Sequence, residues 1–278
     1  MGRKAVSGIM LTLLWISVLS MCGSDGKVNP TSEAFDIQTT NATSAQQKYS
    51  INSEPPPTQW SRTYGGAGSD EAWSVVQTTD GGYIMAGRTN SFGAGSIDFW
   101  LVKTDSAGNQ QWSQTYGGTY GEWAYCVQQT IDGGYIIAGY TASFGPGGAA
   151  FWLVKTDGSG NQQWSKTYGG GGSDIAWSVR QTSDGGYMIA GDHTPYGIGE
   201  TTDFWLVKTD SAGNQQWSKT YGGASDDYAR SVVQTTDGGY VVAGRTNSFG
   251  SGGDFWLVKT DSNGNMQWSK TYGGTYGE

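Results

Sequence analysis

The chain is 278 residues long and acidic, with 24 Asp and Glu against 16 Lys and Arg and a formal net charge of −8. This charge disfavours nucleic acid and anionic lipid as partners, because neutralising phosphates requires clustered Lys and Arg. The 13 tryptophans are therefore not expected to form a platform for stacking bases.

Residues 1–22 are typical of a secretory signal peptide. Arg3 and Lys4 precede an uncharged, largely apolar run that ends at Met21. The junction resembles a lipoprotein signal, in which Cys22 would be lipidated, although a small residue normally precedes that cysteine. Ordinary cleavage after Ser20 is the alternative. Both interpretations predict export, with membrane contact only through an N-terminal lipid or an uncleaved signal.

Residues 23–58 are rich in Asn, Thr, Ser and Gln and end near three consecutive prolines at 55–57. Such a composition buries too little apolar surface to offset chain entropy. We expect a disordered or extended stalk that holds the following domain away from a membrane.

Residues 59–278 repeat one unit four times, with units ending near residues 117, 169, 222 and 273. A fixed period of this length indicates an array of one supersecondary unit. The closing tryptophans, spaced by 52, 52, 53 and 51 residues, are Trp60, Trp112, Trp164, Trp217 and Trp268.

Each unit contains four short strand signals. In the first unit they cover 72–78, 83–89, 98–104 and 111–116, and Asp80–Gly82 supplies a hairpin turn between the first two. Nothing beyond the signal peptide is typical of a helix. Four antiparallel strands at this period predict an all-β fold, a β-propeller of four four-stranded blades.

The third strand of each unit carries adjacent Phe and Trp residues, such as Phe99 and Trp100, so both of its faces are apolar. A strand of this kind is covered on both sides, as it is when blades stack around an axis. The tryptophan in the fourth strand is expected to lie between blades as well.

The repeated Thr-Tyr-Gly-Gly, Asp-Gly-Gly-Tyr and Trp-Leu-Val-Lys-Thr-Asp sequences resemble the propeller repeats of archaeal and bacterial cell-surface proteins, of kelch-like or quinoprotein-like type. The resemblance covers residues 59–278 and implies surface display and binding more than an activity. The spacing from Asp105 through Gly108 to Trp112 is one residue shorter than in the quinoprotein tryptophan-docking motif.

The count of strands is uneven. Residues 59–65 match a fourth strand and precede the first full unit, so the fourth strand occurs five times and the others four times. Either four blades close into a small ring with one surplus strand, or the array is an incomplete ring. Two chains would supply eight blades, and a homodimer that completes a ring is one hypothesis.

An acidic residue precedes the first strand of every blade. If these strands line the central axis, the carboxylates would form a ring that binds a hard cation such as Ca²⁺ or Mg²⁺. The favoured alternative is that each carboxylate accepts hydrogen bonds from nearby backbone amides. The residues are Asp70, Glu122, Asp174 and Asp227.

The loop between the second and third strands carries an aromatic residue in every copy. These rings would stack on sugars, or, in the favoured interpretation, fold back onto their own blade. The third copy diverges most and contains Asp192 and the single histidine, His193, which we interpret as a surface substitution. The loop aromatics are Phe92, Phe144, Tyr196 and Phe249.

Two further sets of residues, each at one position of the repeat, are interpreted as structural rather than functional. The aspartates of the hairpin turns are interpreted as turn residues, and the lysines of the third strands as solvated strand positions. The aspartates are Asp80, Asp132, Asp184 and Asp237, and the lysines are Lys103, Lys155, Lys208 and Lys259.

No nucleophile motif, phosphate loop or Cys/His metal cluster occurs in the sequence. We therefore expect an extracellular, surface-displayed binding or adhesion module for carbohydrate or a surface protein, without catalysis or an organic cofactor. The alternatives are a propeller enzyme, either a quinoprotein-like oxidoreductase or a glycan-processing enzyme, and a passive structural component of the surface.

Overall fold

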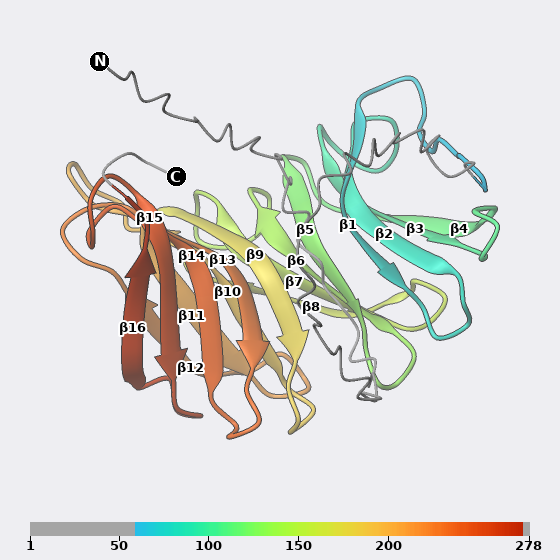
Figure 1. Cartoon of the computed structure of the whole chain (residues 1–278). Coiled ribbons are helices and arrows are strands. Elements are labelled where there is room, and N and C mark those ends of the chain that lie inside the picture. The colour runs from blue at the N-terminus through green and yellow to red at the C-terminus, as the bar shows by residue number, and fades with distance from the viewer. Residues whose placement is uncertain (1–58, 275–278) are drawn as a thin grey trace, which may run out of the picture.

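The computed structural model describes residues 59–274, which form four antiparallel sheets of four strands each. The predicted all-β propeller architecture is confirmed, and no helix occurs in this range. Residues 1–22 and 23–58, interpreted from the sequence as a signal peptide and a stalk, lie outside the described residues, and so does Cys22. Figure 1 shows the sheets following one another in chain order, as blades 1 to 4.

Consecutive strands pair in every blade. Blade 1 contains β1 (Asp70–Gln77), β2 (Tyr83–Thr89), β3 (Asp98–Thr104) and β4 (Gln110–Tyr116). Blade 2 contains β5 (Glu122–Gln129), β6 (Tyr135–Thr141), β7 (Ala150–Thr156) and β8 (Gln162–Tyr168). Blade 3 contains β9 (Ser173–Gln181), β10 (Tyr187–Thr194), β11 (Asp203–Thr209) and β12 (Gln215–Tyr221). Blade 4 contains β13 (Asp227–Gln234), β14 (Tyr240–Thr246), β15 (Asp254–Thr260) and β16 (Met266–Tyr272).

The Asp-Gly-Gly sequence forms the turn between the first two strands of each blade. In blade 1 the Thr78 amide donates to the Gly82 carbonyl at 2.9 Å, and Gly81 has a φ of 82°. Glycine suits this position because residues with a Cβ rarely adopt positive φ. The turn predicted from the sequence is therefore present.

Aromatic residues of the third strands join neighbouring blades. Between blades 1 and 2, the ring centre of Phe99 lies 4.6 Å from that of Trp152. The phenylalanine comes from β3 and the tryptophan from β7, so each third strand packs on both sides, as its two apolar faces predict. The corresponding pairs, at 4.5 and 4.7 Å, are Phe151–Trp205 and Phe204–Trp256.

The fourth strand of each blade packs on the following blade. The Trp112 ring centre lies 5.9 Å from that of Tyr135, and the Tyr116 hydroxyl donates to the Gly160 carbonyl at 2.6 Å. The next two junctions repeat both contacts, with Trp164 on Tyr187 and Tyr168 on Gly213, then Trp217 on Tyr240 and Tyr221 on Gly264.

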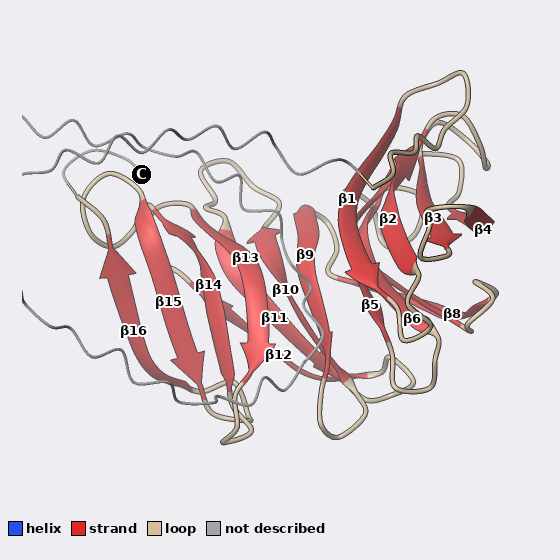
Figure 2. Ribbon diagram, turned by 45° about the vertical axis from the view of Figure 1, so that its right-hand side comes forward, coloured by secondary structure: helices blue, strands red, loops and turns tan. Residues whose placement is uncertain are grey.

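The innermost strand of each blade is the first one in sequence. β1 contacts β5, β5 contacts β9, and β9 contacts β13. Figures 1 and 2 show the blades fanning out from these strands, and the four described sheets do not close into a ring.

The surplus strand is the one difference from the expected architecture. Residues 59–65 form no strand in any described sheet. They nevertheless take the place of a fourth strand against blade 1, where the Trp60 ring centre lies 5.9 Å from that of Tyr83. The Tyr64 hydroxyl also donates to the Gly108 carbonyl at 2.6 Å. Residues 59–65 therefore repeat the side-chain packing of a fourth strand, but they have no paired strand in a described sheet to supply backbone hydrogen bonds.

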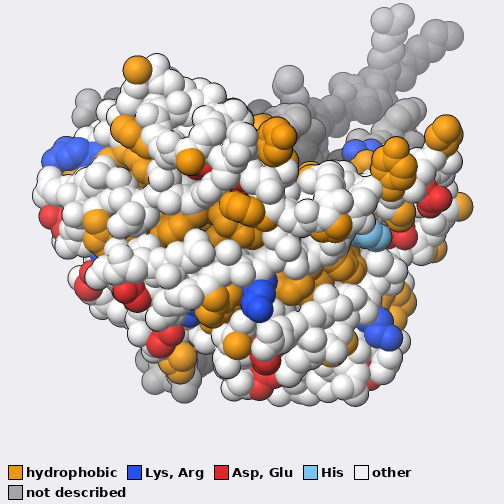
Figure 3. All heavy atoms as spheres, turned by 180° about the vertical axis from the view of Figure 1, so that it is seen from behind, with side chains coloured by type: hydrophobic (Ala, Val, Ile, Leu, Met, Phe, Trp, Pro, Cys, Tyr) orange, Lys and Arg blue, Asp and Glu red, His pale blue; other side chains and the backbone are white. Residues whose placement is uncertain are grey.

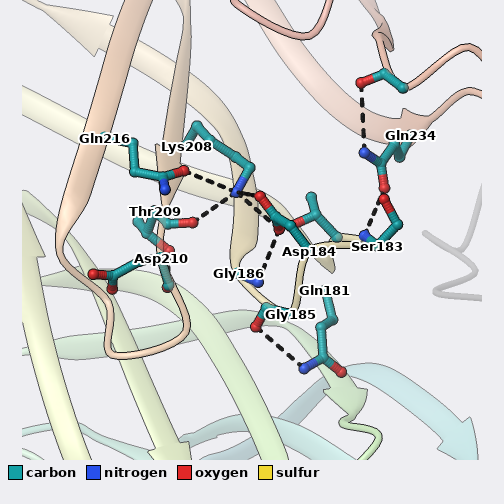
Figure 4. A network of polar contacts seen from close by, with 12 residues as sticks. Gln181, Ser183, Asp184, Gly185, Gly186, Lys208, Thr209, Asp210, Gln216 and Gln234 are labelled. Atoms are coloured by element: carbon teal, nitrogen blue, oxygen red, sulfur yellow. Dashed lines mark hydrogen bonds and ion pairs between the residues drawn. The ribbon is translucent and has the colours of Figure 1, made fainter.

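The lysines of the third strands are buried, so their interpretation as solvated strand positions is wrong. The side chain of Lys208 is 4 % exposed, and its ammonium donates to Asp184, to the Thr209 carbonyl and to Gln216 (Figure 4). A buried ammonium needs such partners, because desolvating an unpaired charge is costly. Lys103, Lys155 and Lys259 bind Asp80, Asp132 and Asp237 in the same way.

The surface mixes apolar and polar side chains. On the face shown in Figure 3, hydrophobic side chains form bands, whereas acidic and basic side chains are scattered. That face therefore carries no large patch of a single charge.

Candidate binding site at the propeller axis

A β-bulge interrupts each innermost strand at the same position. The pairing of β1 with β2 shifts between Ala72 and Ser74, which leaves Trp73 without a partner on β2. Bulges re-aim a side chain and are common next to functional sites. The same shift occurs in the other three blades, and the bulged residues are Trp73, Tyr125, Trp177 and Arg230.

These four side chains form one continuous row, which we name the axial row. The ring centres of Trp73 and Tyr125 lie 5.5 Å apart, and those of Tyr125 and Trp177 lie 4.2 Å apart. The guanidinium carbon of Arg230 lies 4.5 Å from the Trp177 ring centre. All four innermost strands therefore contribute to one row of contacting aromatic rings that ends in a cation.

Further aromatic and charged side chains flank the row on the side of blades 1 and 2. Trp123 and Tyr140 lie 6.4 and 6.3 Å from Tyr125 between ring centres. The guanidinium of Arg88 lies 4.1 Å from the Trp123 ring centre and forms an ion pair with Glu71. The flank supplies hydrogen-bond donors and acceptors next to apolar ring faces.

Asp192 binds the two residues at the blade 3 and blade 4 end of the axial row, Trp177 and Arg230. Its carboxylate accepts hydrogen bonds from the Trp177 indole and from Arg230, the latter at 2.8 and 3.1 Å. Burial raises the pKa of Asp192, and the interactions with Arg230 and Trp177 oppose that effect without cancelling it. The acid fixes the orientation of both neighbours.

The row is accessible at both ends. Trp73 is 42 % exposed, and the side chain of Arg230 is 47 % exposed. Tyr125, in the middle, is buried. A ligand could contact the ends of the row without unfolding any strand.

A cavity of about 1040 Å³ lies where the innermost strands end. All four blades line it with equivalent residues, including Gln77, Gln129, Gln181 and Gln234. Glutamine side chains join neighbouring blades there. For example, the side-chain oxygen of Gln234 accepts a hydrogen bond from the Ser183 backbone amide at 2.8 Å (Figure 4). We interpret the role of these glutamine amides as joining neighbouring blades rather than binding a ligand.

The acidic residues expected before the first strands, Asp70, Glu122, Asp174 and Asp227, accept hydrogen bonds from neighbouring loops. Glu122 accepts hydrogen bonds from the Thr141 hydroxyl and from the amides of Gly118 and Ser143. Asp70, Asp174 and Asp227 accept the amides of Gly66, Gly170 and Gly223. No three His, Cys, Asp or Glu side chains within residues 59–274 are grouped so that they could hold a metal ion. Each of the four carboxylates therefore bonds within its own loop, and the alternative of a cation-binding ring has no support in the described residues.

The loop aromatics pack on their own blades. The ring centres of Phe92 and Phe144 lie 5.4 Å from those of Trp100 and Trp152, and Phe249 lies 5.0 Å from Trp256. In blade 3 the ring of His193 takes this place, 5.2 Å from Trp205, and bonds to Asp174. Tyr196 is left 89 % exposed. Since these contacts stay within single blades, the loop residues form no common site.

Of the residues singled out in the sequence, only Asp192 belongs to the axial row and its surroundings. A usable signal was present, because the bulge position reads Trp, Tyr, Trp and Arg in the four copies and follows an alanine every time. A variable position inside an otherwise repeated strand is free of the constraints that build the blade.

Neither a protein-family model nor a curated protein sequence matches the chain. Among solved structures, it is similar to a protein of unknown function from Dyadobacter fermentans, with 16 % identity, a TM-score of 0.52, and coverage of 71 % of this chain and 67 % of that one.

Two further similarities have lower TM-scores. One is to a protein of unknown function from Bacteroides caccae, with 13 % identity, a TM-score of 0.41 and 65 % of this chain covered; the match spans 56 % of that protein. The other is to an endo-1,4-beta-xylanase from Bacteroides thetaiotaomicron, with 16 % identity, a TM-score of 0.43, and 72 % and 71 % covered. At 16 % identity, the similarity to the Dyadobacter fermentans protein supports the fold alone.

Proposed function

We propose that this chain is an exported binding module, displayed at the cell surface, that takes carbohydrate at the axial row. The row of three contacting aromatic rings carries the proposal, with Trp73 and Trp177 partly exposed on either side of the buried Tyr125. In this row, partly exposed aromatic rings lie beside charged groups from blades 1, 3 and 4.

The chemistry of the row suits a sugar. A pyranose ring has apolar C–H faces, which pack on aromatic rings, and a rim of hydroxyls, which need fixed donors and acceptors. Ligand sites commonly combine aromatic walls with a few placed polar groups. Arg230, Asp192, Arg88 and Glu71 supply such groups beside the rings.

Export and surface display rest on the N-terminal sequence. We infer cleavage near residue 22, with Cys22 as the attachment point if it is lipidated, and residues 23–58 as the tether. The described residues contain no helix with the length and apolar character to cross a membrane. Mass spectrometry of the mature N-terminus would distinguish a lipidated Cys22 from free secretion.

Glycan-array screening followed by calorimetric titration of the best oligosaccharide tests the binding function. We expect Trp73→Ala to weaken binding about tenfold, because an aromatic contact contributes about 0.5–1.5 kcal/mol. The matched control is Tyr196→Ala, which removes an aromatic residue that is 89 % exposed and lies outside the axial row.

Three outcomes would contradict the proposal. The first is an array without hits, and the second is full binding by Trp73→Ala combined with loss in Tyr196→Ala, which would move the site to the loops. The third is release of reducing ends from the bound oligosaccharide, which would favour the glycan-processing enzyme over a binding module.

A further inference from the structure

Each blade presents what we name a leading face, made of the phenylalanine of its third strand and the tryptophan and tyrosine of its fourth. In blades 1 to 3 the following blade covers this face. In blade 4 no described residue covers it, and Phe255 is 61 % exposed, Trp268 42 % and Tyr272 51 %. The covered counterparts of Phe255, which are at most 1 % exposed, are Phe99, Phe151 and Phe204.

The three covered junctions show what this face binds. Each receives the opposite face of the next blade, through the contacts from Phe to Trp, from Trp to Tyr, and from the Tyr hydroxyl to a glycine carbonyl. Three exposed rings on one face of blade 4, where Phe255 is paired with Tyr272, offer apolar surface of the kind that marks interaction sites. Its chemistry therefore specifies another blade of this repeat as the occupant.

Blade 1 offers the complementary surface, and part of it is open. Val75 on β1 is 42 % exposed, whereas its counterparts Val127 and Val179 are fully buried against a preceding blade. The outer part is covered by Trp60 and Tyr64, which occupy the place of a preceding fourth strand.

We propose that the leading face of blade 4 docks on blade 1 of a second copy of this chain. One chain carries both complementary faces, so the contact is heterologous, and two such contacts close a ring. Four blades from each copy give eight, which is within the range of 4–8 typical of propellers.

The same geometry makes residues 59–65 a competitor of this contact. Trp60 lies 5.9 Å from Tyr83, as Trp112 lies 5.9 Å from Tyr135, and Tyr64 bonds to Gly108 as Tyr116 bonds to Gly160. β16 of a second copy would bring Trp268 and Tyr272 to those same places. Residues 59–65 must therefore leave blade 1 before the second copy can dock fully.

Light scattering of the full chain after size exclusion, over a wide range of concentrations, tests the proposal. We expect the double variant Trp60→Ala, Tyr64→Ala to dimerise at a concentration at least about tenfold lower than the unmodified chain. Adding Phe255→Asp should return that variant to the monomer mass. The matched control adds Ile131→Asp, which also introduces an acid at an exposed apolar residue, 93 % exposed in a hairpin turn.

Circular dichroism would verify that each variant keeps its strands, and Phe255 is exposed enough for its replacement to leave the fold intact. A monomer at every concentration in the double variant would overturn the proposal. So would a dimer that Phe255→Asp does not weaken, because it would then form through another surface. Dimer formation lost with Phe255→Asp and kept with Ile131→Asp supports it.

Discussion

At the scale of the residue, the buried carboxyl group of Asp98 is expected to lower the stability of the folded chain. It is 2 % exposed at the start of β3, and its Oδ1 has no hydrogen-bond partner among the described residues. The neighbouring Glu122, by contrast, is fully bonded to its own loop. Burial raises the pKa of Asp98, the Ala94 amide lowers it, and the charge of Glu122 raises it again, to about 6. Blade 2 has Ala150 at this position and so avoids the cost.

We expect Asp98→Asn to stabilise the chain at pH 8 by about 1 kcal/mol and to have little effect at pH 5. The folded-state pKa lies above the ordinary 3.8, so the folded chain holds this proton more tightly than the unfolded chain. Stability of the unmodified chain therefore falls as the pH rises through about 6. Urea unfolding at both pH values measures this.

Asp261→Asn is the control for that experiment. Its hydrogen bonds with Asn265 lower the pKa of Asp261, so this group stays ionised across the range from pH 5 to 8. An equal change in pH dependence from the two variants would contradict the role given to Asp98.

At the scale of the element, the hairpin of the first two strands is tied to the third and fourth strands by a buried lysine. In blade 3 the Lys208 ammonium reaches both oxygens of Asp184, at 2.8 and 3.1 Å, and also the Thr209 carbonyl. Burial alone would raise the pKa of Asp184, but hydrogen bonds from Lys208, Thr182 and Gly186 outweigh it and lower the pKa to about 2. This contribution to stability is complete above the ordinary pKa and is lost as the pH falls toward 2.

We expect the two partners to differ in the cost of removal. Asp184→Ala should destabilise the chain by about 3 kcal/mol, because it leaves a buried ammonium with neutral partners only. Lys208→Met should cost about 1 kcal/mol or less, because the Asp184 side chain is 54 % exposed and keeps its hydration. Urea unfolding at pH 7 compares them.

The combined variant Asp184→Ala, Lys208→Met completes that cycle. It should be more stable than Asp184→Ala alone, because the unpaired charge is gone. Additive losses in the combined variant would show that the pair is not coupled.

At the scale of the whole molecule, stability is expected to come largely from the junctions between blades. The core is a series of layers between sheets, and one cluster of buried residues runs through blades 1 to 3. Each layer repeats the same aromatic contacts. Equivalent residues should therefore differ in importance only where a neighbouring blade is missing.

Phe204 and Phe255 test this, because they occupy the same position in blades 3 and 4 and are 0 % and 61 % exposed. Phe204→Ala should destabilise the chain by about 3–5 kcal/mol, the cost of a large cavity. Phe255→Ala should change stability by no more than about 0.5 kcal/mol. Urea unfolding at low protein concentration, where self-association is absent, provides the measurement, and equal losses would contradict the layered core.

The candidate site was less predictable from the sequence than the fold. Asp192 stood out because the third copy diverges there, yet Trp73, Tyr125 and Trp177 read as ordinary apolar strand residues. Their role depends on a bulge in each innermost strand, and a variable residue after an alanine does not by itself identify a bulge. The buried lysines were missed for a related reason, since a lysine in an alternating strand is usually solvated.

The sequence alone determined the repeated unit, its four strands, its Asp-Gly-Gly turns and the aromatic layers between blades. These features are local or recur at a fixed period, so propensity and pattern suffice to predict them. Only the tertiary structure decided which side chains meet across strands and blades: the axial row, the lysine–aspartate ties and the open face of blade 4. The axial row joins residues about 50 positions apart in neighbouring blades, and each lysine–aspartate tie joins residues 22–24 positions apart within one blade. Both follow from how strands and sheets pack rather than from any local preference.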